Sequence, residues 1–170
     1  MTQLTLTGAA SHYRCEVLDV SPSTNTECLS RADLGDPGDL WIMAHEQSKG
    51  RGSRGRDWQS IAGNLHASVL LRNPCTTQFL SQLTFVAVLA AHKAVADYLG
   101  NPADALQVKW PNDLLLNRKK LGGILLESHE VGEERRRIVI IGIGINCMVH
   151  PQDVPTPATD LAVEGMAIPA

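Results

Sequence analysis

Apolar and polar residues alternate over short stretches along most of the chain, and this spacing predicts β-strands. The segment "CEVLDV" alternates and is rich in β-branched residues, whereas "RIVIIGIGINC" is apolar throughout and long enough for a buried strand. The predicted strands cover residues 15–20, 39–46, 64–72, 106–110, 113–117, 121–128 and 137–147. The basic turn "RKK" between the fifth and sixth of these strands predicts a hairpin.

Two segments have helical spacing instead. Residues 77–99 repeat apolar positions with a helical period, and the helix should end at the Gly100-Asn101-Pro102 sequence. A shorter helix is predicted between Thr24 and Gly35, because Thr24 and Glu27 have capping-box spacing and Gly35 is a plausible stop. This order of elements predicts the α+β class, with a mixed, mostly antiparallel sheet and flanking helices.

Composition and charge place the chain among ordinary globular proteins. It has 170 residues, 44% of them hydrophobic, and a net charge of −3, which suits one domain over residues 1–170. The N-terminus has no signal-peptide pattern, and His92, Lys93 and Asp97 interrupt the most apolar stretch, so we expect a cytoplasmic protein without a membrane partner. The negative net charge argues against a nucleic-acid partner.

Cysteine and histidine positions predict no structural metal. The four cysteines form no CxxC pair, so isolated reduced thiols are expected, and no two histidines have the spacing of a helical zinc site.

The segment "GRGSRGRDW" at residues 50–58 concentrates positive charge on a flexible loop. Glycines allow the backbone to approach a ligand closely, and arginines match carboxylates and phosphates with forked donors. A solvated basic loop is the alternative interpretation, and this segment alone does not decide between the two.

The segment "VKWPNDLLLNRKKLGGILLE" gathers further polar residues around a rigid Trp-Pro turn. The glycine pair Gly122-Gly123 leaves room for a ligand beside the strand, which favours a function for the neighbouring Lys120. Lys119 is better explained as a solvated residue of the hairpin turn.

Two shorter segments complete the candidate set. In "GIGIN", Gly142 and Gly144 leave one face of a strand bare, for a ligand or for another part of the chain. In "SPSTN", the local sequence alone is explained by a helix cap.

Taken together and in this order, "STN", "GRGSRGRDW", "KWPND", "KLGGIL" and "GIGIN" resemble the catalytic domain of biotin protein ligases over residues 16–150. The resemblance implies the class II synthetase-like fold that biotin and lipoate ligases share. It also implies a two-step reaction: biotin and ATP with Mg²⁺ form biotinyl-5′-AMP, and the biotin then passes to a lysine of a biotin carrier domain. A lipoate or octanoate ligase and a non-catalytic biotin-binding remnant are the alternatives.

The resemblance also assigns roles to residues. Lys120 and Arg51 are the implied catalytic residues, and Asp113 is the implied contact of the magnesium that accompanies ATP. The implied biotin-binding residues are Ser23, Thr24, Asn25, Gln47, Gly50, Arg51, Gly52, Ser53, Lys120, Gly122, Gly123, Gly142 and Gly144. The implied nucleotide-binding residues are Arg54, Arg56, Trp58, Lys109, Asn112, Asp113 and Asn146.

Two features depart from the family pattern. Ser53 replaces a more usual arginine that is associated with holding the adenylate, so we expect weaker retention of that intermediate unless Arg54 substitutes. The chain also ends early, so we expect a catalytic domain truncated at its C-terminal end, without an N-terminal DNA-binding domain or a C-terminal β-barrel. The sequence leaves a homodimer open.

Overall fold

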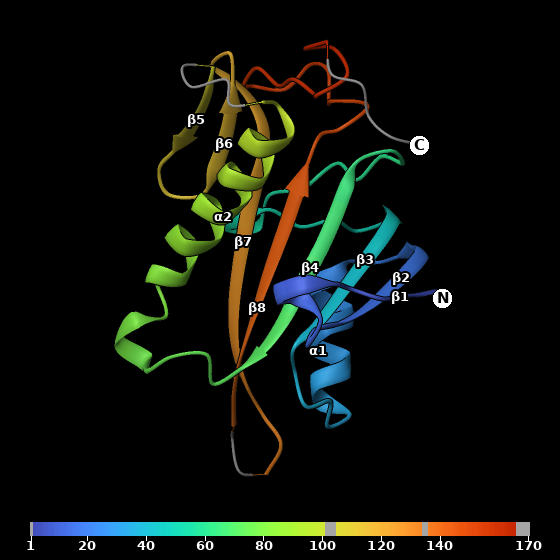
Figure 1. The fold of residues 1–170 in the computed structure, drawn as a ribbon, viewed down its shortest axis with the longest axis vertical. Coiled ribbons are helices and arrows are strands. Elements are labelled where there is room, and N and C mark those ends of the chain that lie inside the picture. Colours follow the sequence, from blue (N-terminus) through green and yellow to red (C-terminus); the bar gives the residue numbers. More distant parts are fainter. Residues whose placement is uncertain (1, 101–104, 134–135, 166–170) are drawn as a thin grey trace.

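The computed structural model describes residues 2–100, 105–133 and 136–165, which form a single eight-stranded sheet with two α-helices (Figure 1). The strands are β1 (Thr2–Leu4), β2 (Arg14–Ser21), β3 (Leu40–Gln47), β4 (Leu65–Arg72), β5 (Leu106–Lys109), β6 (Asp113–Leu116), β7 (Lys119–Val131) and β8 (Arg136–Ile145). The helices are α1 (Thr24–Asp33) and α2 (Gln82–Tyr98), with 3₁₀ turns at Gly8–Ala10, Ser53–Gly55 and Thr77–Phe79.

The strands lie in the order β1-β2-β3-β4-β8-β7-β6-β5. Among the eight described strands, only β2 and β3 pair in parallel, and α1 makes the crossover that a parallel connection needs. The other neighbouring strands pair antiparallel, and the long central pair β7 and β8 is enclosed by β4 on one side and β6 on the other. The α+β class with a mixed, mostly antiparallel sheet is therefore confirmed.

The two helices cover opposite faces of the sheet. Successive residues of a strand point to opposite faces. On β8, Ile140 belongs to the buried cluster with Cys28 of α1, and Ile141 belongs to the cluster with Val88 of α2. Gly142 and Gly144 follow Ile140 in this alternation, so they lie on the face of α1, and Gly142 packs against Asn25 in the first turn of that helix.

The structure corrects the expected helix boundaries. Ser23, not Thr24, is the N-cap of α1, and Thr24 is the first helical residue. The predicted helix 77–99 is divided into a 3₁₀ turn that ends at Phe79 and the α-helix that begins at Gln82. The hairpin before β7 is confirmed, with Asn117 and Arg118 at its turn in left-handed conformations. No helix among the described residues is long and apolar enough to span a membrane.

Candidate active site

A cavity of about 350 Å³ opens on the face of the sheet that α1 partly covers. Its walls come from the start of α1, the loop after β3, the turn before β6, the two central strands and the segment after β8. These segments lie far apart in the sequence, and the sheet order brings them together. The cavity is therefore a product of the topology rather than of any single motif.

Two glycines of β8 admit the side chains that shape this cavity. A Cβ at Gly144 would lie 2.6 Å from Cε2 of Trp58, so the indole ring rests directly on the strand backbone. A Cβ at Gly142 would collide with Oδ1 of Asn25, which lies on the strand in the same way. The bare face predicted from "GIGIN" is thus occupied by two side chains that line the cavity.

The end of the cavity next to α1 is polar and buried. Asn25 and Thr24 are each less than 5% exposed, and both contact Ser68 of β4. The Ser68 hydroxyl donates to Oδ1 of Asn25 at 2.5 Å, and the two hydroxyl oxygens of Thr24 and Ser68 are 2.7 Å apart. Gln47 accepts the backbone N–H of Thr24 at 2.8 Å and donates to Ser60 Oγ at 2.7 Å. These bonds hold the amide and hydroxyl groups in fixed directions.

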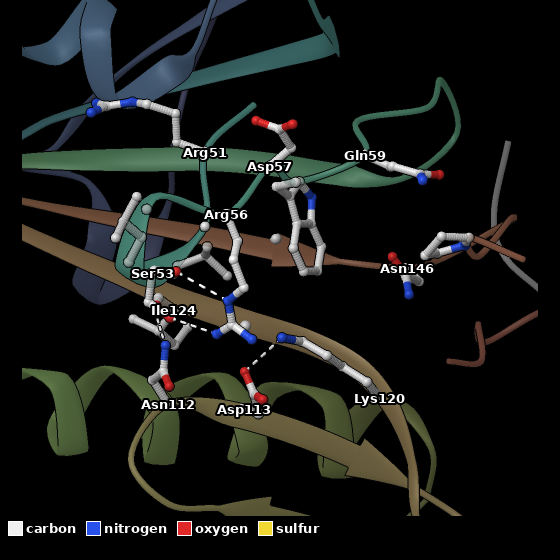
Figure 2. Close-up of a pocket in the computed structure, with 18 of the residues that line it drawn as sticks. Arg51, Ser53, Arg56, Asp57, Gln59, Asn112, Asp113, Lys120, Ile124 and Asn146 are labelled. Atoms are coloured by element: carbon white, nitrogen blue, oxygen red, sulfur yellow. Dashed lines mark hydrogen bonds and ion pairs between the residues drawn. The ribbon is translucent and has the colours of Figure 1, made fainter. Parts of the chain in front are cut away.

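Positive charge gathers at the other part of the cavity. Nζ of Lys120 lies 2.8 Å from Oδ1 of Asp113, and it also lies 5.6 Å from the ring centroid of Trp58. Figure 2 shows the Arg56 side chain reaching toward this pair, while Arg51 points away from it. The guanidinium of Arg56 donates to the backbone oxygen and the hydroxyl of Ser53 at 3.2 and 3.0 Å. A forked donor and a compact ammonium thus face the same space, as recognition of an anion requires.

The arginine-glycine loop folds back on itself over the cavity. Gly52 N–H donates to Arg56 O at 2.7 Å, and Arg51 pairs with Asp57 as an isolated antiparallel bridge. The guanidinium of Arg51 binds both carboxylate oxygens of Glu127, at 2.9 and 2.8 Å. The loop is therefore tied to β7 at one side of the cavity, with Arg56 on its inner side.

The segment after β8 forms a further wall. The N–H of Lys120 donates to Pro157 O at 2.7 Å, and Lys120 forms a parallel bridge with Ala158, so this segment runs along the start of β7. His150 Nδ1 and Asp160 Oδ2 are 2.6 Å apart and close the base of the segment. The proline-rich composition after residue 150 gave no indication of this role.

Two residues that line the cavity each carry a buried polar atom without a hydrogen-bond partner among the described residues. These atoms are Nε1 of Trp58, which is a donor, and Oδ1 of Asn146, which is an acceptor. The amide nitrogen of Asn146 donates to Thr159 O at 3.0 Å, which fixes its oxygen in place. Buried polar atoms normally find partners, so these two unpaired atoms are an uncommon feature of the cavity wall.

The cavity collects most of the residues singled out in the sequence. Those that line it are Ser23, Thr24, Asn25, Gln47, Arg51, Gly52, Ser53, Arg56, Trp58, Lys109, Asn112, Asp113, Lys120, Gly123, Gly142, Gly144 and Asn146. Gly50, Arg54 and Gly122 are not among the lining residues. Gly50 packs behind the loop near Ser60, and a Cβ at Gly122 would lie 2.6 Å from Gly144 O, so Gly122 serves close strand pairing.

Sequence reasoning missed the wall formed by Pro151, Val154, Pro155, Thr156 and Ala158. It also missed Ser68 and Glu127, which contact the lining residues. No motif marks them, and only the pairing of distant strands brings them to the site.

The metal expectation can be compared with the residues present. Within residues 2–100, 105–133 and 136–165, no three His, Cys, Asp or Glu side chains are grouped so that they could hold a metal ion. Magnesium that accompanies a nucleotide takes most ligands from phosphates and water, with only one or two protein carboxylates. Asp113, which lines the cavity beside Lys120, fits that limited role.

Comparison with known proteins places the chain in a family. The sequence profile of the biotin/lipoate A/B protein ligase family matches residues 17–146. The chain belongs to this family, and the resemblance noted from its motifs is confirmed.

Individual relatives narrow the likeness to biotin ligases. The chain is 45% identical over 129 residues to the biotin--[acetyl-CoA-carboxylase] ligase of Paracoccus denitrificans. The matched residues make up 76% of this chain and 52% of that protein. The chain thus spans about half the length of this relative.

Two solved structures share the fold. The biotin protein ligase of Leishmania major in complex with biotinyl-5-AMP matches with a TM-score of 0.74 at 31% identity, over 88% of this chain and 64% of that one. The ligase of Aquifex aeolicus in complex with biotin and ATP matches with a TM-score of 0.72 at 30% identity, over 88% and 60%.

Proposed function

We propose that this chain activates biotin with ATP to biotinyl-5′-AMP and transfers the biotin to a lysine of a biotin carrier domain. The observation that carries the proposal is the cavity itself, because it joins a polar end at Asn25 to a cationic centre at Lys120 and Arg56. Family membership and relatives whose solved structures contain biotin, ATP or biotinyl-5-AMP support the same assignment.

The ligands follow the chemistry of the cavity walls. The polar ring of biotin suits the buried end formed by Thr24 and Asn25. The adenine suits Trp58 and Asn146, which offer an aromatic ring and an amide side chain in the cavity wall. The carboxylate of biotin and the α-phosphate of ATP then meet near Lys120.

In the first step, a carboxylate oxygen of biotin forms a bond to the α-phosphorus, and the bond from that phosphorus to the bridging oxygen breaks, releasing pyrophosphate. Both reactants are anions, so positive groups must offset their repulsion and stabilise charge at phosphorus. Lys120 and Arg56 face the same part of the cavity and would take this role (Figure 2). Magnesium would neutralise phosphate charge, with Asp113 as its protein contact.

In the second step, the neutral amine of the carrier lysine attacks the acyl carbon, and AMP leaves as the new amide forms. The amine loses its proton to water. The loop that ends at Trp58 and the segment Pro151–Ala158 enclose the cavity from two sides and would limit the access of water to the adenylate. No side-chain nucleophile is needed.

The test is a single incubation of the purified chain with biotin, Mg-ATP and an apo biotin carrier domain, followed by the intact mass of the carrier. Octanoate and lipoate are parallel acids. A biotin-sized gain that requires ATP is expected. A gain with lipoate or octanoate instead would assign the chain to the other branch of the family, and biotin binding without pyrophosphate release would identify a non-catalytic binding protein.

The remaining expectations stay predictions. They are the cytoplasmic location, the carboxylase that supplies the carrier domain, the absence of a DNA partner and the open question of a homodimer.

A further inference from the structure

Glu127 connects two parts of the site without lining the cavity. Its Oε2 accepts hydrogen bonds from Nδ2 of Asn25 at 2.7 Å and from Arg51 at 2.8 Å, and its Oε1 accepts from Arg51 at 2.9 Å. Glu127 is two residues beyond Leu125 on β7, so it lies on the same face of the sheet as the cavity. Its side chain is 20% exposed, so it reaches Asn25 from just outside the ligand space.

The charge of Glu127 fixes the direction of the next hydrogen bonds. An ionised carboxylate accepts hydrogen bonds and donates none. Asn25 must therefore turn its NH₂ group to Glu127 and its oxygen to Ser68, whose hydroxyl donates to that oxygen at 2.5 Å. The single hydroxyl hydrogen of Ser68 is used in this bond.

Thr24 completes the chain of hydrogen bonds. Its hydroxyl oxygen lies 2.7 Å from Ser68 Oγ and 3.2 Å from Gln47 Oε1, and neither of these oxygens has a hydrogen left to give. Gln47 directs its NH₂ group to Ser60 at 2.7 Å, so its oxygen faces Thr24. The Thr24 hydroxyl must therefore donate within the protein, and it is left with lone pairs toward the cavity, which it lines.

We propose that Glu127 is a positioning residue that sets the donor and acceptor directions along Asn25, Ser68 and Thr24. In consequence, Thr24 meets a ligand as a hydrogen-bond acceptor and selects a ring that presents N–H groups, as a cyclic urea does. This inference rests on the proposed function, in which the ureido ring of biotin occupies this end of the cavity.

The test uses Glu127→Gln, which keeps the size of the side chain but can donate as well as accept. The Asn25 amide is then free to turn over, so the donor and acceptor directions along the series of hydrogen bonds are no longer fixed. We expect biotin to bind about tenfold to a hundredfold more weakly by calorimetry without ATP, as for a lost bond to a charged group. Glu127→Gln also weakens the bonds to Arg51 that hold the arginine-glycine loop, so the affinity for ATP alone is compared in Ser68→Ala, which keeps these bonds and should stay within about twofold of the wild type.

Two further variants separate positioning from general damage. Ser68→Ala interrupts the same series of hydrogen bonds between Asn25 and Thr24. E127Q and S68A together should therefore weaken biotin binding no more than the stronger single change. Glu130→Gln is the matched control, because Glu130 lies on the opposite face of β7, where its Oε1 is 3.5 Å from Arg137. Its affinity for biotin should equal that of the wild type.

The ratio of the affinities for biotin and for an analogue methylated at the ureido nitrogens provides a second measurement. This ratio would not change if Glu127 only supported the fold. The wild type should discriminate strongly against the analogue, and E127Q and S68A should discriminate less. If E127Q fails to fold, S68A alone provides this comparison.

Unchanged biotin affinity in E127Q, fully additive effects of the two changes, or undiminished discrimination in both variants would overturn the inference while the wild type still binds biotin. A wild type that binds no biotin would overturn the proposed function, and this inference with it.

Discussion

The ammonium of Lys120 lies 2.8 Å from a carboxylate oxygen of Asp113, and both side chains remain about one-fifth exposed to the cavity. Under the proposed function, this ion pair would lie where the two anionic substrates meet, and it would hold the ammonium where charge develops during the reaction. The pair accounts for the presence of "KWPND" and "KLGGIL" in one site, because β6 and β7 place the two residues side by side.

Lys120→Ala should reduce biotinyl-5′-AMP formation by about a hundredfold to a thousandfold, as for the loss of one preorganised group that stabilises a developing negative charge. Release of pyrophosphate in the first turnover measures this step. Lys119→Ala is the matched control, because Lys119 is half-exposed and lies 3.9 Å from Glu164 rather than in the cavity. Equal losses in the two variants would refute a specific role for Lys120.

Alanine at the two glycines of β8 should separate the two ends of the cavity. Gly144→Ala places a Cβ 2.6 Å from the Trp58 ring and should raise the KM for ATP, whereas Gly142→Ala displaces Asn25 and should raise the KM for biotin. Each increase should be roughly tenfold or more, because small displacements of positioning groups have large effects. Steady-state kinetics with each substrate varied in turn provides the measurement, and each variant is the control for the other. Identical effects on both substrates would contradict this division.

Ser53→Arg should slow the escape of biotinyl-5′-AMP from the protein. Ser53 now accepts two hydrogen bonds from Arg56, and an arginine at this position would add a second guanidinium beside the first. Additional positive charge near a phosphate should lengthen its residence time by about tenfold. The amount of adenylate released during turnover without a carrier domain can be followed by chromatography. An unchanged release rate would show that Ser53 does not weaken retention.

Asp36→Asn should lower the free energy of unfolding and flatten its dependence on pH in acid. Burial raises the pKa of Asp36, but the bonds from Arg14 and from Gly38 N–H outweigh this and hold the pKa below its ordinary value. The carboxylate therefore stabilises the fold above its unfolded pKa, and that stability is lost as the pH falls from about 4 toward the folded pKa. The loss at pH 7 should be about 1 kcal/mol, because Arg14 is half-exposed.

Urea unfolding at pH 7 and pH 3 measures this contribution. The difference between wild type and Asp36→Asn should be largest at pH 7 and should shrink at pH 3. A difference that grows in acid would have the wrong sign for a lowered pKa.

Much of the fold could be predicted because local spacing and burial agree. The alternation in "CEVLDV" and the apolar run ending in "GIGIN" predicted the strands observed as β2 and β8. The break between Phe79 and Gln82 could not be predicted, because both sides of it continue the same helical period. The three-residue strand β1 is too short for a period to be detected.

The site was predictable where a residue type itself carries the chemistry, as with Lys120, Trp58 and the glycines of β8. It was not predictable where the role depends on register. Glu127 reaches Asn25 across 102 positions of sequence, and only the pairing of β7 with β8 places it there. In the sequence Ser68 is an ordinary strand residue. It belongs to the site because Thr24 and Asn25 of α1 lie against it.

The strand order also has a consequence for how the molecule is made. Leu65 of β4 pairs with Ile145 of β8, so these two strands are 80 positions apart in the sequence at this pair. The sheet under the cavity therefore forms only when β8 reaches β4. Contacts between such distant segments form slowly, because a large loop must close before they contribute. During synthesis, a growing chain has no complete pocket until β8 and the wall at residues 151–158 have emerged from the ribosome. Under the proposed function, biotin would bind only a chain that has assembled its central sheet, and its stabilising effect would act on that sheet as a whole.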